Sequence, residues 1–533
     1  MYNNYTPLQQ RQLALQEYSN TQSTYLLVCA PARSTALKAT LTDQLHRKFR
    51  LVDRLDGELT ASVDGVLLAA EDVELMSTAL MYFAKALQDG ADYAVCNAVF
   101  GFGGATALYQ SQPLQAQNRC AVVSRTLLER CRAAAHDPEN VPELLALAAQ
   151  LCTRPTLIPQ ALLHYERGIC AEDAFSAHGK RAFIMSHVLD MTGAPIVLVS
   201  AVPVLRSMGY EVLVLGPSDG GSLHLFLDAG ASVITRSSCR NVSDAWGMAL
   251  CADFVIANTV VMARAVRALS GTAVPVLWWL HDAFAGYPHI AHQIPTQLGE
   301  NVRVYSVGSH AANAMRAVRP EFEIRPLIYG LPDYAAENFV RTDLGYNRGR
   351  PLFATVGSFE RRKGHDIFCK AIRLLPPEVR EKASFLFVGQ AADKEMMDSV
   401  RALTADYPEN VFYCKRLTRD EIKSLMEQCT GLVCASRDDP MPTFVTEGLI
   451  FGKPSIVSEH TGTAGLISEG RNGFVYHDDD PQQLAVLLEH AIEHPEELAS
   501  MRTECRKMYE QYYSKEAFEQ TLRAAVEDLT AKK

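Results

Sequence analysis

Residues 431–474 read GLVCASRDDPMPTFVTEGLIFGKPSIVSEHTGTAGLISEGRNGF, and this stretch decides the fold. It predicts a buried strand over Gly431–Ala435, a polar loop to Pro442, and a helix that stops at Gly452-Lys453-Pro454. A second strand over Ser455–Val457 and a Gly/Thr loop over Thr461–Gly465 follow. Strand, helix and strand in this order are typical of an α/β sheet.

Composition narrows the class of protein. The chain has 533 residues, which is too many for one hydrophobic core and favours about three domains. Its net charge of −10 argues against broad binding to nucleic acid, so any anion site must be local. The 13 cysteines form no CxxC pair, and we expect buried free thiols in a reducing cytoplasm. No apolar run predicts a membrane span.

The N-terminal part predicts a small α/β domain. Residues 1–22 are polar and predict a tail or a solvated helix without a signal core. Over residues 23–165 we expect a strand from Thr24, a helix over Thr35–Phe49 and further strands. The Ala/Leu-rich region from about 130 to 178 predicts helix, and residues 166–179 predict a helical connector.

Two further domains follow in tandem. Residues 180–338 and 345–515 each alternate apolar strands with helices, which predicts parallel sheets covered on both faces. Residues 516–533 predict a C-terminal helix. Ligands of such sheets bind at the carboxyl ends of the strands, so the loops that follow the strands are the places to look for a site.

Several motifs in these two domains resemble the family-4 glycosyltransferases of the GT-B fold. The N-terminal half of that fold is similar to SHVLDMTGAPIVLVSAVPVLRSMGYEVLVLGPSDG and VLWWLHDAFAGY. The C-terminal half is similar to ATVGSFERRKGHDIF, FLFVGQ, the 431–474 stretch and GRNGFVYHDDDPQQLAVLL. Each motif is moderately specific, but their shared order over about 350 residues is strong. The resemblance implies an α/β fold of two tandem Rossmann-like domains and a retaining, metal-independent transfer of a sugar from a nucleotide-sugar.

The segment 23–165 resembles a degenerate GT-A domain of the family-2 kind. That family places a metal-binding Asp-x-Asp after a strand, and the matching residues here are Leu68-Ala69-Ala70-Glu71-Asp72. Ala69 offers no carboxylate oxygen to a divalent metal, although Glu71 and Asp72 could still bind one. We therefore predict a domain without catalytic activity and no metal site. Gly101-Phe102-Gly103-Gly104 is read as a flexible turn.

The resemblance assigns roles on the C-terminal domain. Lys363 matches a family lysine at the donor diphosphate, whereas Ser358 stands near the family arginine, so Arg361 or Arg362 would have to substitute. Glu447 matches the second Glu of an E-x7-E pattern that binds ribose hydroxyls, and Asp439 replaces the first, which contacts the donor sugar. The remaining predicted donor residues are Gly357, Thr443, Phe444, Thr461, Gly462, Arg416 and Leu417.

The physical chemistry agrees with these roles. Without a metal, cations and backbone N–H groups must stabilise the leaving diphosphate, and a carboxylate suits a ribose diol because it accepts two hydroxyl hydrogens. His281, which matches the family histidine, would face the reacting sugar and the acceptor. Thr192, Gly193 and Ala194 match a small-residue turn that lets backbone approach the donor phosphate or the acceptor. Each role has an alternative interpretation. Arg361–Lys363 could be a solvated basic turn, Asp439 and Glu447 could cap and solvate a helix, and His281 could be a packed core residue.

Two functions stay open, and a nucleotide-sugar epimerase on the same fold is a third option, since the fold alone does not fix the chemistry. The first is an active hexosyltransferase that uses a UDP- or GDP-linked donor and a glycan, lipid-linked or protein acceptor, without a cofactor. The second is a GT-B protein without catalytic activity that binds a glycan or stabilises another transferase. We expect a cytoplasmic protein with no nucleic-acid partner; contact with the inner membrane face and a homo-oligomeric state remain open.

Overall fold

The computed structural model describes part of the chain in detail. The described residues are 23–29, 35–41, 44, 46, 48–55, 62–69, 73–76, 78–101, 106–110, 120–165, 179–218, 220–236 and 248–531. The predicted N-terminal tail, Glu71, Asp72, the connector 166–178 and the Phe102–Gly104 turn lie outside them. The chain divides into two compact units, residues 1–255 and 256–533, and each is described by itself.

A mixed sheet forms the first unit. Its strand order is β9-β10-β11-β6-β5-β7-β3-β1-β2, with β8 paired to both β5 and β4. The strands are β1 (Leu26–Cys29), β2 (Phe49–Val52), β3 (Gly65–Ala69), β4 (Glu74–Leu75), β5 (Tyr93–Gly101), β6 (Thr106–Gln110), β7 (Cys120–Ser124), β8 (Pro155–Tyr165), β9 (Lys180–Met185), β10 (Tyr210–Gly216) and β11 (Ser232–Arg236). The helices are α2 (Thr35–Leu41), α3 (Ala79–Gln88), α4 (Arg125–Ala134), α5 (Val141–Leu151), α6 (Gly193–Ser207) and α7 (Leu223–Asp228).

Two expectations for the first unit are wrong. The helix expected over Thr35–Phe49 ends at Leu41, and Phe49 opens β2 because Phe49–Val52 pairs in parallel with β1. The expected helix from about 130 to 178 gives way to β8, which pairs with β5. Pro155 and Pro159 lie in that segment, and proline removes a helical hydrogen bond, so strand pairing prevails over the helical propensity of its Ala and Leu residues.

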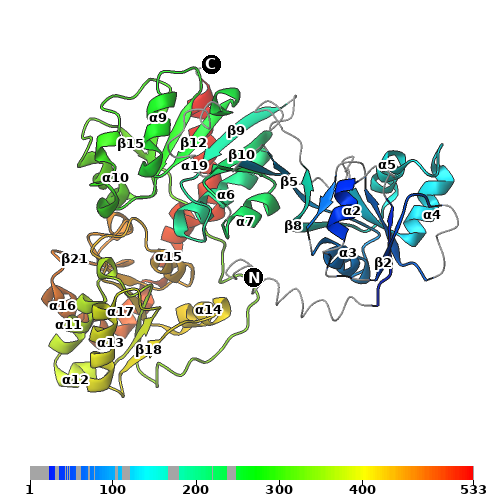
Figure 1. The fold of residues 1–533 in the computed structure, drawn as a ribbon. Helices are drawn as coiled ribbons and strands as arrows, with labels where there is room; N and C mark the ends of the chain where they lie inside the picture. Colours follow the sequence, from blue (N-terminus) through cyan, green and yellow to red (C-terminus); the bar gives the residue numbers. More distant parts are fainter. Residues whose placement is uncertain are drawn as a thin grey trace. The chain divides into compact units, whose positions relative to one another are not determined.

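The second unit contains a six-stranded parallel sheet in the order β18-β17-β16-β19-β20-β21, which we call the C-terminal sheet. Its strands are β16 (Leu352–Val356), β17 (Ser384–Val388), β18 (Val411–Cys414), β19 (Gly431–Cys434), β20 (Ser455–Ser458) and β21 (Gly473–Tyr476). The helices that accompany it are α11 (His365–Leu374), α12 (Pro377–Arg380), α13 (Lys394–Asp406), α14 (Arg419–Gln428), α15 (Thr443–Ile450), α16 (Pro481–Glu493), α17 (Pro495–Ser500) and α18 (Arg502–Met508). Figure 1 shows α11, α13 and α16 gathered around this sheet.

The remainder of the second unit is built on β13 (Val276–Leu280), β14 (Val302–Ser306) and β15 (Ile324–Pro326), which pair in parallel. Helices α9 (Ala263–Leu269) and α10 (Ser309–Arg316) belong to it, and β12 (Phe254–Asn258) contains the boundary between the units. The predicted C-terminal helix is α19 (Lys515–Thr530), whose Phe518 stacks on Trp279 with ring centroids 5.8 Å apart. The last helix of the chain therefore packs against β13, in agreement with the red helix of Figure 1.

The structure confirms the α/β fold class and the elements of the 431–474 stretch. Strand β19 ends one residue before the prediction, α15 begins directly after Pro442, and β20 begins at the predicted Ser455. The cysteines that the structure describes are free, and most are buried. Among the described residues, no helix combines the length and the apolar character that a membrane crossing requires.

Candidate active site

A basic turn follows β16 and approaches the loop that follows β19. Arg361–Lys363 forms a 3-10 turn that ends at Gly364, whose φ of 67° is left-handed. A Cβ atom at Gly364 would lie 1.8 Å from the carbonyl oxygen of Ala435, so only glycine allows this approach. Strands β16 and β19 are neighbours in the sheet, which brings the two loops to the same carboxyl edge.

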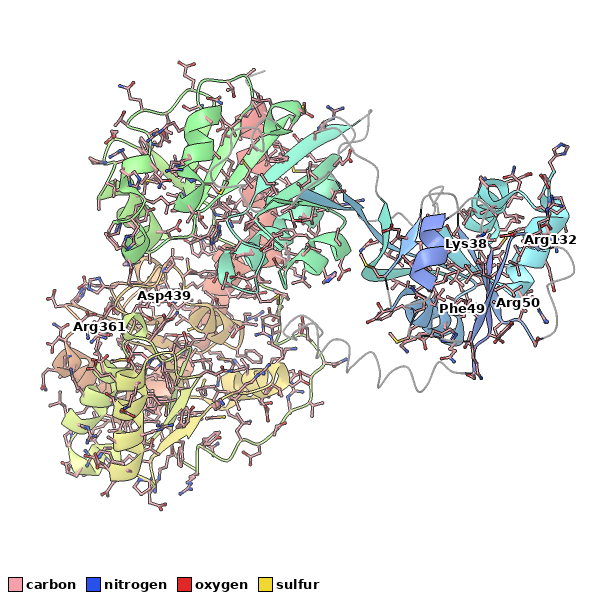
Figure 2. The ribbon with its side chains drawn as sticks, in the orientation of Figure 1. Lys38, Phe49, Arg50, Arg132, Arg361 and Asp439 are labelled. Atoms are coloured by element: carbon pink, nitrogen blue, oxygen red, sulfur yellow. The ribbon has the colours of Figure 1, made fainter. Side chains whose placement is uncertain are left out.

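Lys363 and Asp439 meet at this edge. The Nζ of Lys363 donates a hydrogen bond to Oδ2 of Asp439 at 2.6 Å, and the Asp439 side chain is only 5% exposed. Oδ1 of Asp439 accepts from the backbone N–H of Met441 at 3.2 Å. The carboxylate is therefore paired and held, as a buried charge must be. Figure 2 labels Asp439 and also Arg361, the first residue of the basic turn.

Arg437 anchors the basic turn. Its backbone N–H donates to the carbonyl of Arg362 at 2.7 Å, and its guanidinium donates to the carbonyl of Arg361 at 2.9 Å. The same guanidinium holds both carboxylate oxygens of Asp366, at 2.7 and 2.8 Å. Burial alone would raise the pKa of Asp366, but the Arg437 pair lowers it below its usual value. Hydrogen bonds from Arg437 therefore hold the backbone of the basic turn in place.

Glu447 lies on α15 and is paired with a residue that the sequence did not single out. Its Oε1 accepts a hydrogen bond from Arg419 at 2.6 Å, and the Glu447 side chain is 10% exposed. The guanidinium of Arg419 lies over the ring of Tyr334, 4.2 Å from its centroid. Burial would lower the pKa of Arg419, but Glu447 and Tyr334 raise it. One oxygen of Glu447 is therefore engaged by an arginine.

The Gly/Thr loop closes over the loop that contains Asp439. The N–H of Gly462 donates to the carbonyl of Asp439 at 2.9 Å, and a Cβ at Gly462 would lie 1.7 Å from the carbonyl oxygen of Pro440. The hydroxyl of Thr461 donates to the carbonyl of Ser458 at 2.9 Å. It also lies 3.2 Å from the hydroxyl of Thr463. Thr461 and Gly462 thus lie beside Asp439, and their role at the donor diphosphate stays a prediction.

The other predicted donor residues surround this group more loosely. The N–H of Gly357 donates to Val388, and Ser358 donates to Glu360 at 2.8 Å, so Ser358 is engaged locally. Glu360 also accepts from Arg362 at 3.0 Å. Thr443, which is exposed, and Phe444, which is buried, open α15. Arg416, which is exposed, and Leu417, which is partly buried, lie in the loop between β18 and α14.

His281 follows β13, at the carboxyl edge of the other sheet part of the second unit. Its ring lies 4.7 Å from that of Trp279. The next residue, Asp282, accepts a hydrogen bond from the N–H of Val260 at 2.6 Å, and burial raises its pKa to about 6. Thr192 and Gly193 lie in the first unit, where Thr192 directly precedes α6 and its N–H donates to Oδ1 of Asp190 at 3.1 Å.

Asp438, beside Asp439, was missed from the sequence. It accepts hydrogen bonds from His310 and from the N–H groups of Phe284 and Ala285. The doublet Asp438-Asp439 in a polar loop was a usable signal, because two adjacent carboxylates in an extended loop point to opposite sides. Among the described residues, no His, Cys, Asp and Glu side chains gather as a metal-binding group. The expected independence from metal stays a prediction.

His365, directly after the basic turn, carries a testable consequence for stability. It is 2% exposed, packs against Phe359 with centroids 4.5 Å apart, and neither ring nitrogen has a hydrogen-bond partner. Burial, with a smaller effect from Lys363, lowers its pKa to about 3. The unfolded chain takes up this proton near pH 6.5 and the folded chain does not, so stability is lost as the pH falls from about 6.5 toward 3.

We expect His365→Leu to reduce the acid sensitivity of the C-terminal sheet. From pH 7 to pH 5 the free energy of unfolding should decrease in both proteins, and the decrease should be roughly 2 kcal/mol smaller in His365→Leu than in the wild type. This follows from 1.36 kcal/mol per pH unit for each proton that only the unfolded chain binds. The measurement is the urea midpoint followed by hydrogen exchange of peptides from β16 and β17. His289→Leu, at an exposed position, is the control. Equal pH dependence in wild type and His365→Leu would contradict the prediction.

Comparison with known proteins then identifies the family. Residues 178–318 match the profile described as glycosyl-transferase family 4, and residues 337–508 match glycosyl transferases group 1. The chain thus carries a family-4 glycosyltransferase domain followed by a group 1 glycosyltransferase domain. Together the two matches cover more than half of the chain. They begin at residue 178, so the GT-A-like interpretation of residues 23–165 stays a prediction.

Two curated relatives match at low identity. Spore coat protein SA of Bacillus subtilis is 27% identical over 160 residues, which are 28% of this chain and 41% of that protein. The uncharacterized glycosyltransferase MJ1178 of Methanocaldococcus jannaschii is 25% identical over 194 residues, 36% of this chain and 53% of that protein. The chain thus spans about half or less of the length of these relatives.

Solved structures of similar fold are GT-B glycosyltransferases. HepE of Anabaena, crystallised in complex with UDP, is 18% identical with a TM-score of 0.54, over 66% of this chain and all of that one. Sucrose-phosphate synthase of Thermosynechococcus elongatus is 15% identical with a TM-score of 0.53 over the same shares. At these identities the likeness shows the fold: two Rossmann-like domains of the GT-B type.

Proposed function

We propose that this protein transfers a hexose-type sugar from a UDP- or GDP-linked donor to a hydroxyl group of a glycan, lipid-linked or protein acceptor. The transfer retains the anomeric configuration and needs no metal ion. The observation that carries the proposal is the Lys363–Asp439 pair, 2.6 Å long, where β16 and β19 end. HepE, a structural neighbour, was crystallised with UDP and with UDP-glucose, which favours UDP as the nucleotide.

The paired side chains keep enough capacity to bind a donor. An ammonium group has three N–H donors, so Lys363 can hold Asp439 and still donate to a phosphate oxygen. Glu447 gives one oxygen to Arg419, and its other oxygen, which has two lone pairs, can accept a hydrogen from each of the two ribose hydroxyls. Asp439 can likewise accept from a hydroxyl of the donor sugar. The pairs therefore preorganise the site, which lowers the cost of ordering it when the donor binds.

The proposed step moves charge onto the diphosphate. The acceptor oxygen forms a bond to the anomeric carbon while the bond from that carbon to the diphosphate oxygen breaks. The acceptor proton passes to the leaving diphosphate, so no further reactant is needed. Lys363, the neighbouring arginines and the N–H groups at the start of α15 stabilise the charge that develops. His281 would orient the acceptor hydroxyl.

The experiment is a donor panel with the purified full chain. It is incubated with UDP-glucose, UDP-galactose, UDP-N-acetylglucosamine and GDP-mannose, with and without EDTA, and free nucleotide and sugar are followed by NMR. We expect slow hydrolysis of one donor that EDTA does not affect, with the α-anomer released first from an α-linked donor. No binding of any nucleotide would favour the glycan-binding or transferase-stabilising alternative. A cytoplasmic location, contact with the membrane face and self-association stay predictions.

A further inference from the structure

Asp438 accepts hydrogen bonds from a part of the second unit that is far away in sequence. Its Oδ1 accepts from the N–H of Phe284 at 3.1 Å and its Oδ2 from the N–H of Ala285 at 2.8 Å. These two amides open the 3-10 turn Phe284–Gly286, just after His281. Nε2 of His310, the second residue of α10, lies 2.7 Å from Oδ1 of Asp438. The four groups are called the Asp438 network.

The two charged or polar side chains of the network are buried, whereas Phe284 and Ala285, which supply the amides, are exposed. The side chains of His310 and Asp438 are 6% and 13% exposed, and the ring of Phe284 lies 5.0 Å from that of His310. Burial alone would raise the pKa of Asp438, yet the hydrogen bonds from His310 and the two amides hold it below the usual value. Its backbone carbonyl accepts from Arg362 at 3.3 Å. Asp438 is therefore an ionised carboxylate with a fixed position.

The backbone at Gly308, just before α10, also approaches the loops that contain Met441 and Gly462. A Cβ atom at Gly308 would lie 2.8 Å from Cε of Met441 and 3.2 Å from the carbonyl oxygen of Gly462. Asp438 and Asp439 are consecutive, so the same loop contacts Lys363 through one carboxylate and the His281 loop through the other. A backbone shift at one of these residues also displaces the other, because only one planar peptide unit joins them.

We propose that Asp438 is a positioning residue that holds the His281 loop in register with the donor site. This inference rests on the proposed function. The carboxylate of Asp438 contacts no group assigned to the nucleotide or the sugar, so the side chain affects the reaction through the placement of His281. Because a displacement of about 1 Å can cost a hundredfold in rate, its loss should lower kcat and leave nucleotide affinity nearly unchanged.

The test compares Asp438→Ala, Asp438→Asn and Asp480→Ala with the wild type. Asp480 also accepts a backbone hydrogen bond with its carboxylate, from the N–H of Gln482 at 2.8 Å at the start of α16. It therefore controls for the loss of an aspartate that holds backbone amides away from the proposed site. The readouts are kcat, the Kd of UDP by calorimetry, and hydrogen exchange of peptides that contain residues 281–290.

We expect Asp438→Ala to lower kcat at least about tenfold, to change the UDP Kd by less than about twofold, and to speed exchange in the 281–290 peptides. Asp438→Asn, which keeps one carbonyl-type acceptor, should lie between it and the wild type. Unchanged exchange or unchanged kcat would overturn the inference, and so would a loss of UDP affinity as large as the loss of kcat. Exchange is measured without substrate, so a wild type without turnover overturns the proposed function separately.

Discussion

Glu447→Ala should lose at least about a hundredfold in kcat/KM for the nucleotide-sugar, with a nearly unchanged melting temperature. The carboxylate is expected to accept ribose hydroxyl hydrogens, and a hydrogen bond to a charged group contributes about 1.5–3 kcal/mol. Two such bonds, at 1.36 kcal/mol per tenfold change in rate, give this magnitude. Folding should suffer little because the released Arg419 side chain is 49% exposed and remains on the ring of Tyr334.

The matched control for this prediction is Glu427→Ala. Glu427 lies on α14 and also pairs with an arginine, Arg341, at 3.0 Å, but it belongs to no part of the proposed site. The measurement is steady-state release of nucleotide alongside a thermal melt of each variant. Undiminished turnover by Glu447→Ala, or an equal loss in Glu427→Ala, would contradict the assigned role of Glu447.

Replacement of Lys363 should affect both catalysis and folding, and the two effects can be separated. In Lys363→Met the leaving diphosphate loses a positioned cation, which should lower kcat by about a hundredfold to a thousandfold. The variant also leaves the buried carboxylate of Asp439 without its partner, which should cost roughly 3 kcal/mol of unfolding free energy. The measurements are single-turnover rates and the urea midpoint of the C-terminal sheet.

The double variant Lys363→Met/Asp439→Asn separates the two roles. It removes both charges, so the stability should return most of the way while the rate stays low. Lys370→Ala is the control, because Lys370 is an exposed lysine on α11 whose Nζ lies 3.6 Å from Oδ2 of Asp366. Recovery of the rate together with the stability would show that Lys363 acts only in folding.

The strand and helix boundaries of the 431–474 stretch followed from local signals. Pro442 restricts the chain just before α15, and Gly452 with a φ of 71° ends it, so the pattern of residues was sufficient. Both members of the Lys363–Asp439 pair were found, but the pairing itself depends on β16 and β19 being neighbours in the sheet. That adjacency joins residues far apart in sequence, and local patterns do not contain it.

Arg419 and the strand β8 were missed for similar reasons: their partners are distant in sequence, and the local pattern favours another interpretation. Arg419 follows Thr418, which forms a capping box with Glu421, so the segment reads as an ordinary helix start. Its contact with Glu447 appears only in the folded chain. The strand β8 was read as helix because its partner β5 lies about 60 residues earlier, and strand preference depends on such partners.

The proposed function requires that a nucleoside diphosphate binds at the edge of the C-terminal sheet, beside Lys363, Asp439 and Glu447. The most direct measurement is calorimetric titration of UDP and GDP into the full chain and into Glu447→Ala, with Glu427→Ala as control. We expect saturable binding of one nucleotide by the wild type and by Glu427→Ala, and at least about tenfold weaker binding by Glu447→Ala. Equal binding by Glu447→Ala, or no binding of either nucleotide by the wild type, would contradict it.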